Sequence, residues 1–188
     1  MKKIASYIFA FVLILSLISC SDVYDEVIIT DLKEYDSVWS LPERSAHETS
    51  FLFPGNVKEE QCILFFCKHT TYFPLGTGWQ LVLEIEYDNL EFLEEITRLK
   101  KLCAESSIRD FSEYFDGPVY VTVWNWDSCF EYAMVDEEKR TVSYVYLDCI
   151  PKEDLVIDEK YVFKGYERKL PDANSYSIYL PHNEGDAH

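Results

Sequence analysis

The sequence lacks the residue patterns that mark the common catalytic and metal-binding sites. It contains no G-x-S-x-G or H-E-x-x-H motif and no C-x-x-C pair, and the acidic run at 136–138 lacks the glycine and alternating acids of a calcium loop. The four histidines, His47, His69, His182 and His188, have no ligand spacing among them. The residues therefore predict no cofactor and no metal site, and they favour binding over catalysis.

Positive charge is also scarce in this chain. There are 17 lysines and arginines against 34 aspartates and glutamates, which gives a formal net charge of -17. Such a body repels nucleic acid and anionic lipid headgroups, so we exclude a nucleic-acid partner. The charge is typical of a solvated acidic surface that keeps a protein soluble, and it is also compatible with a cationic partner.

The longest hydrophobic run is too short for an ordinary spanning helix. Lys2 and Lys3 precede an apolar segment, residues 4–18, and Asp22 follows soon after it. A spanning helix needs about 20 apolar residues, whereas a positive start and a shorter apolar centre are typical of an export signal. An uncleaved anchor and a conventional cleavage site just before residue 20 remain as alternatives.

The apolar run ends in Leu17-Ile18-Ser19-Cys20. This segment resembles the lipobox of bacterial lipoprotein precursors, in which a branched apolar residue, a tolerant position and a small residue precede an invariant cysteine. The resemblance implies cleavage after residue 19 and acylation of Cys20, with at least two chains such as palmitate, at the extracytoplasmic face of the cell membrane. Two chains make a stable anchor. The whole chain also resembles small uncharacterised lipoproteins of Gram-positive bacteria, a likeness that implies no particular activity.

Five cysteines remain once the first is assigned to the lipid, and an odd number cannot all pair within one chain. The two in the expected strand 61–67 would be about 16 Å apart, beyond the roughly 7 Å that a disulfide spans. Cys129 and Cys149 lie at the open ends of an expected hairpin, and they face each other if its loop centres on Lys139. A one-residue change of register removes that match, so this bridge is only a hypothesis.

Composition divides the chain into four parts. Residues 1–19 are the predicted signal peptide, and the acidic residues 20–49 are expected to form a tether that is partly docked. Within that stretch, residues 27–29 fit either a short strand or the start of a packed segment. Residues 50–180 have the length and apolar content of a single domain, and residues 181–188 are expected to be disordered.

Alternation and helical periodicity predict an antiparallel sheet with one main helix. The helix, 89–105, has Asp88 as its N-cap and a polar face that includes Glu95. Its apolar stripe comprises Leu90, Leu93, Ile96, Leu99, Leu102 and Cys103. Strands are predicted at 61–67 or 61–72, 79–87, 118–124, 129–135 and 141–149, and residues 153–180 are expected to add a short helix and an edge strand. The order ββαβββ, with about five strands, predicts an α+β fold with the helix packed on one face.

Side-chain parity on the last three strands separates an aliphatic face, which the helix would cover, from an aromatic face. The aliphatic set is Val119, Val121, Val123, Ala133, Val135, Val145 and Leu147, and the aromatic set is Tyr120, Trp124, Phe130, Tyr132, Tyr144 and Tyr146. A flat array of rings suits a sugar or protein ligand. The predicted binding face is therefore Tyr120, Trp124, Tyr132, Tyr144 and Tyr146. In the alternative, the N-terminal stretch or residues 153–180 cover the rings as a second core layer.

These observations favour a membrane-tethered extracytoplasmic lipoprotein that acts as a non-enzymatic binding or interaction module. Two alternatives remain. A cell-envelope hydrolase would need a deep pocket that holds His69 or His47 beside a nucleophile. An inhibitor or immunity-type protein would use its acidic surface against a basic partner.

Overall fold

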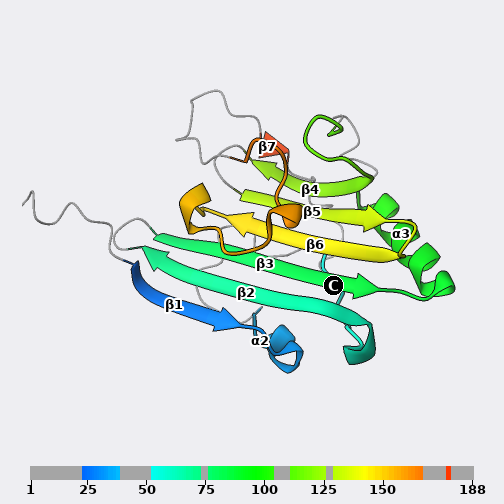
Figure 1. Ribbon diagram of the computed structural model, residues 1–188, viewed down its shortest axis with the longest axis horizontal. Coiled ribbons are helices and arrows are strands. Elements are labelled where there is room, and N and C mark those ends of the chain that lie inside the picture. The colour runs from blue at the N-terminus through cyan, green and yellow to red at the C-terminus, as the bar shows by residue number, and fades with distance from the viewer. Residues whose placement is uncertain are drawn as a thin grey trace, which may run out of the picture.

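Seven antiparallel strands form one sheet in the part of the chain that the structure describes. The structure is a computed structural model, and it describes residues 23–38, 52–72, 76–103, 111–125, 129–166 and 177–178. Across the sheet the order is β1 (Val23–Ile29), β2 (Cys62–Tyr72), β3 (Gly76–Glu86), β6 (Thr141–Asp148), β5 (Cys129–Asp136), β4 (Val119–Asn125) and β7 (Ser177–Ile178) (Figure 1). The predicted order of two strands, a helix and three strands is confirmed, because α3 (Asn89–Cys103) connects β3 to β4.

The sheet has two further strands outside the predicted ββαβββ order, one in the stretch expected to be a tether and one that is the edge strand expected within residues 153–180. Part of the stretch expected to be a tether forms the edge strand β1, followed by the 3-10 turn η1 (Leu32–Glu34) and the short helix α2 (Tyr35–Val38). At the other edge, β7 pairs with β4. The short helix expected after residue 153 is replaced by two 3-10 turns, η3 (Lys152–Asp154) and η4 (Glu159–Tyr161). A further 3-10 turn, η2 (Glu59–Gln61), precedes β2.

Helix α3 begins at the predicted cap, and the second half of its predicted apolar stripe is buried, but the first half is not. The Asp88 carboxylate accepts hydrogen bonds from the backbone N–H groups of Leu90 and Glu91, both at 2.9 Å. The buried side chains of α3 are Phe92, Glu95, Leu99 and Cys103, whereas Leu90 and Leu93 are exposed. The predicted stripe is therefore wrong in its first half, because a charged residue, Glu95, points into the core.

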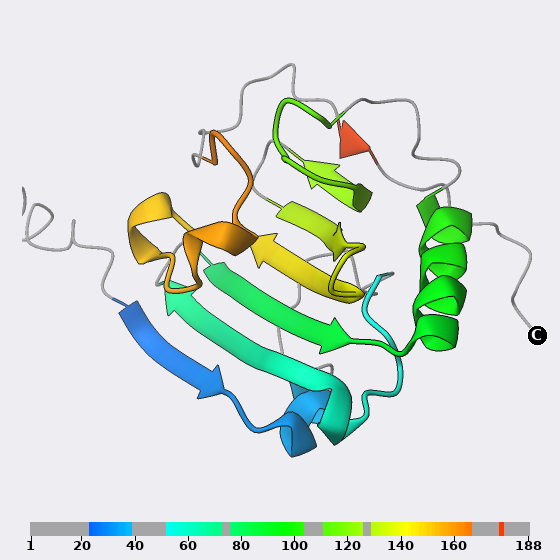
Figure 2. The same cartoon turned by 45° about the vertical axis from the view of Figure 1, so that its right-hand side comes forward.

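The two faces of the sheet carry separate cores. We call the first the α3 face, because α3, α2, Leu52 and Phe53 pack against it. Residues 111–115 and 151–166 cover the opposite face. We call residues 151–166 the strap and this second side the strap face. Figures 1 and 2 show the strap, in orange, crossing one side of the sheet while α3 lies at its end and behind it.

A network of buried polar groups fixes the α3 face. The Glu95 carboxylate accepts hydrogen bonds from the Arg98 guanidinium at 2.6 and 2.8 Å and from the Tyr144 hydroxyl at 2.5 Å. The Tyr87 hydroxyl lies 2.7 Å from that of Tyr144 and extends the chain. Arg98 also donates to the carbonyl of Leu52, which ties the covering segment to the helix. Glu95 can be buried because these donors replace water around its carboxylate.

Leu52 is held from its other side by a second buried carboxylate. The backbone N–H of Leu52 donates to Glu131 on β5 at 3.2 Å, and the Thr122 hydroxyl on β4 donates to the other oxygen of the same group. Glu131 is 1 % exposed, so its charge also depends on protein donors rather than on water. Both backbone groups of one residue are therefore satisfied by side chains from the helix and the sheet.

Replacing Tyr144 by phenylalanine should lower the free energy of unfolding by about 1–3 kcal/mol, because Glu95 stays buried but loses a donor. Chemical denaturation checks the change. The matched control is Tyr120→Phe, at a half-buried tyrosine on the same face, which should alter stability by no more than about 0.5 kcal/mol. Equal effects of the two substitutions would contradict a role for the Tyr144 hydroxyl.

Candidate binding groove

The aromatic residues predicted as a binding face do not lie on one face. Trp124, Phe130 and Tyr132 belong to the core of the strap face. Tyr144, Tyr146 and the half-buried Tyr120 belong to the α3 face. Trp124 and Tyr132 are fully buried, as is Tyr144, and Tyr146 is 3 % exposed. These rings form core layers under the covering segments, which is the alternative that the sequence left open for them, and they offer no open platform.

The register of the β5–β6 hairpin explains why the predicted grouping is wrong. Cys129 lies opposite Asp148, and Tyr132 lies opposite Val145. The predicted grouping needs a register in which Tyr132 shares a face with Tyr146, as it would if the loop centred on Lys139 and placed the two residues opposite each other. A slip of one residue exchanges the faces of every side chain on one strand relative to its neighbour. A bulge in β4 between Val121 and Val123 adds a second shift, which puts these two valines on opposite faces.

The same register is incompatible with the hypothetical Cys129–Cys149 disulfide. Cys149 lies one residue beyond the partner of Cys129, and neither of these cysteines is in a disulfide bond. The thiol of Cys129 is 3.8 Å from the Tyr146 hydroxyl. Burial raises the pKa of the Cys129 thiol, so it is protonated at neutral pH and a poor nucleophile. Cys20, the proposed lipid site, lies outside the described residues.

Buried side chains of the sheet hold the strap in place. Gln80, fully buried on β3, donates to the carbonyl of Asp154 at 2.8 Å and accepts from the N–H of Val156 at 2.9 Å. The Tyr132 hydroxyl donates to the carbonyl of Tyr161 at 2.6 Å. The strap has little regular structure of its own, so these bonds satisfy backbone groups that a helix would pair internally. They also fix where the strap crosses the sheet.

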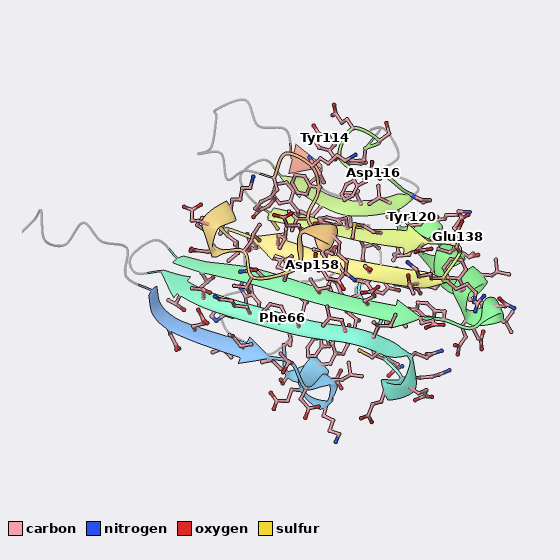
Figure 3. All side chains as sticks on the ribbon, in the orientation of Figure 1. Phe66, Tyr114, Asp116, Tyr120, Glu138 and Asp158 are labelled. Carbon is pink, nitrogen blue, oxygen red and sulfur yellow. The ribbon has the colours of Figure 1, made fainter. Side chains whose placement is uncertain are left out.

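A groove runs along both sides of η4 on the strap face. One cavity of about 440 Å³ lies between the strap, residues 114–118 and the β5–β6 loop. A second of about 420 Å³ lies between the strap and β2. The two adjoin, because Glu84, Lys160 and Tyr161 line both. Figure 3 shows Phe66 on β2 and Asp158 on the strap, with Tyr114 and Asp116 toward β4.

The β2 side of the groove is apolar and open to solvent. Its apolar lining comprises Ile63, Leu64 and Phe66 from β2 and Val156 and Ile157 from the strap. Ile63 is 53 % exposed and Val156 is 55 % exposed, although each is large enough to contribute to a core. An isolated exposed aliphatic residue needs no explanation, but a cluster that lines a concavity marks an interaction site.

The other side of the groove is charged. Lys139 pairs with Asp136 at 2.9 Å, and Lys164 pairs with Asp116. Over both cavities the charged lining residues are Glu84, Asp116, Asp136, Asp158 and Glu159 against Lys139, Lys160 and Lys164. Five carboxylates and three ammonium groups leave a formal charge of -2. The lysines are more than half exposed, so their ion pairs are weak and open to competition by a ligand.

A compact polar cluster separates the two cavities. Glu84 accepts hydrogen bonds from Lys160 at 3.2 Å and from the Tyr161 hydroxyl. The Lys160 ammonium also lies 4.5 Å from the centre of the Tyr161 ring, a cation–π contact. Burial, followed by the hydrogen bond to Glu84, raises the pKa of Tyr161. The pKa of Lys160 is raised mainly by its side-chain interaction with the Tyr161 hydroxyl and, to a smaller extent, by its hydrogen bond to Glu84. At neutral pH the lysine is therefore charged and the tyrosine protonated.

The residues considered for hydrolysis do not meet in this groove. His69 is buried with its ring centre 4.4 Å from that of Trp79, and it lines neither cavity. His47 lies outside the described residues. Among the residues that the structure describes, no group of three or more histidines, cysteines or acids could hold a metal ion. The chemistry that the groove offers is apolar contact combined with charge recognition.

Comparison with family models, curated proteins and solved structures found no match to this chain. Among the described residues, the helices are too short or too polar to cross a membrane.

The groove was not predicted from the sequence, although the sequence contains one signal for it. On β2, Phe65 and Cys67 face the α3 core, and the alternate residues Leu64 and Phe66 are apolar as well. A strand that is apolar on both faces needs a cover on both. The strap covers β3 and the strands beyond it, but it leaves these β2 residues as the wall of the groove.

Raising the pH above about 10, the ordinary pKa of tyrosine, should destabilise the protein and release the strap. Burial raises the pKa values of Tyr35, Tyr87, Tyr132 and Tyr144, so the fold favours their protonated forms. Their contribution to stability is complete below the pKa of the unfolded chain and is lost as the pH rises above it. Denaturation at a series of pH values, with tyrosinate absorbance recorded in parallel, checks this. Stability that stays constant while exposed tyrosines ionise would contradict it.

Proposed function

We propose that this protein is a lipid-anchored, extracytoplasmic binding module that holds a polypeptide partner in the groove beside η4. The observation that carries the proposal is the exposed apolar wall of the groove, formed by β2 and the strap, next to a row of carboxylates and lysines. A partner segment with both apolar and basic side chains would bury the first and pair with the second.

The overall charge supports a basic partner. Loss of residues 1–19 would remove two lysines and no acid, so the formal charge would change from -17 to -19, with 15 basic against 34 acidic residues. A field of that sign speeds the approach of cationic ligands and slows the approach of anionic ones. An inhibitor or immunity-type role against a basic partner would use the same surface. It is therefore a version of this proposal rather than a competitor.

The membrane anchor is the part of the proposal that the sequence supports most directly. The segment Leu17-Ile18-Ser19-Cys20 resembles a lipobox, and a diacylated cysteine would keep the body at the membrane without help from charge. The hydrolase alternative has less support, because His69 is packed against Trp79 and lines neither cavity.

Substitution of Ile63 by serine should weaken partner binding about 5- to 10-fold, since a half-exposed isoleucine contributes on the order of 1 kcal/mol when it is buried. A peptide array that varies apolar and basic content supplies the ligands, and retained peptides should contain both kinds of residue. Fluorescence anisotropy on the best peptide gives the Kd. Raising the salt concentration should weaken binding further, because exposed ion pairs are screened.

Ile28→Ser is the matched control. Ile28 has the same 53 % exposure on the neighbouring strand β1, but it lies outside the groove lining. It should leave the Kd unchanged. Equal losses in the two variants, or retained peptides with no basic residues and no salt dependence, would contradict the groove as the binding site.

A further inference from the structure

The proposed lipid and the first strand of the sheet are separated by very little chain. β1 begins at Val23, three residues after Cys20. An extended chain spans at most about 3.6 Å per residue, so the α-carbon of Cys20 lies within about 11 Å of that of Val23. The acidic stretch 20–49, expected to be a partly docked tether, therefore leaves only residues 20–22 between the lipid and the sheet.

β1 is a firmly attached part of the body. It pairs with β2 from Val23 opposite Tyr72 to Ile29 opposite Cys67. Ile29 is buried in the core of the α3 face, and Glu26 forms an ion pair with Lys68 at 2.8 Å. A lipid on Cys20 is thus connected to one corner of a rigid sheet.

That corner lies at one end of the sheet. Val23 is opposite Tyr72, and Tyr72 is opposite Gly76 on β3. The start of β1, the end of β2 and the start of β3 therefore share this end, as Figure 1 shows. The β5–β6 loop, which contains Glu138, lies at the opposite end of the strands (Figure 3).

The groove lies toward the end away from the anchor. Phe66 and Leu64 precede Tyr72 by six and eight residues, or about 20 and 26 Å at 3.3 Å per residue. Glu84 lies opposite Leu64, at the same distance along the sheet. The first cavity extends still farther, to Asp136 and the loop that follows it.

From these distances we infer that the end of the sheet at which β1 begins rests on the membrane surface, and that the groove is presented to the aqueous side roughly 20 Å above it. This inference rests on the proposed function, because it requires acyl chains on Cys20. The acidic body gains no attraction from anionic headgroups. The repulsion between the body and these headgroups is screened beyond about 8 Å at physiological salt. The short connection through residues 20–22 therefore sets the distance between the sheet and the membrane. A long flexible tether would leave the body free to turn in any direction.

Site-specific photo-crosslinking tests this orientation in the full-length protein in its native membrane. The photo-reactive residue p-benzoylphenylalanine replaces either Asp25 or Glu138, which are both exposed acids at opposite ends of the sheet. Irradiation followed by mass analysis counts adducts with phospholipid. We expect several-fold more lipid adduct from the probe at Asp25 than from the probe at Glu138. Thr77 on β3, next to Gly76, gives a second probe position at the membrane end.

A spacer variant is the internal control. A Gly/Ser insert of about 12 residues between Asp22 and Val23, with a typical end-to-end distance of roughly 20 Å, should reduce the adduct at Asp25 toward that at Glu138. Incorporation of labelled palmitate is measured in every variant. Absence of palmitate would remove the lipid anchor and the proposed function with it. Palmitate present, with equal adducts at the two ends or more at Glu138, would overturn the orientation and leave the proposed function standing.

Discussion

The register of the β5–β6 hairpin is the constraint on which the rest of the structure depends. β6 lies between β3 and β5 and is buried along its whole length, so its alignment decides what each face of the sheet presents. A four-residue loop joins the two strands, and it ends at Arg140 in the left-handed region with φ +55°. With this register Tyr132 faces the strap and bonds to Tyr161, while Glu131 faces Leu52. A slip of one residue would exchange these partners.

On both faces of the sheet, the covering segments without regular secondary structure are held in the same way. Buried polar side chains donate to or accept from backbone groups of the segments that cover them. On the α3 face, Glu131 and Arg98 hold the two backbone groups of Leu52. On the strap face, Gln80 and Tyr132 hold the strap. Because such contacts fix particular backbone atoms rather than a whole surface, the strap can cross the sheet and still leave an apolar wall exposed beside it.

The features that the sequence predicted are those that local chemistry decides. Asp88 caps α3 because it accepts hydrogen bonds from backbone N–H groups only two and three residues farther along the chain. The alternation of buried residues from Leu81 to Ile85 follows from strand geometry alone. The predictions that were wrong concern features that depend on contacts between residues distant in the sequence. Glu95 was predicted to be on the polar face of α3, and its burial depends on Tyr144 on a strand that follows much later.

The split of the aromatic face has the same kind of origin. The parity of side chains within β5 and within β6 was correct, but the loop length that relates the two strands was wrong by one residue. The bulge in β4 could not be read from its alternating pattern either. The groove depends on the strap, whose position is set by Gln80 and Tyr132 through bonds between residues distant in sequence, so periodicity could not locate it.

Three properties belong together in the proposed function: an acidic body, a groove with an apolar wall, and a proposed lipid a few residues before the first strand. The proposed lipid would decide where the other two operate. Substitution of Cys20 by alanine, followed by fractionation and mass analysis of the N-terminus, tests this most directly. For the variant we predict an unacylated precursor that retains residues 1–19, and for the native chain we predict a membrane-bound protein that begins at Cys20. A variant that is processed and membrane-bound like the native chain, or a native protein found in the cytosol with Met1 intact, would contradict it.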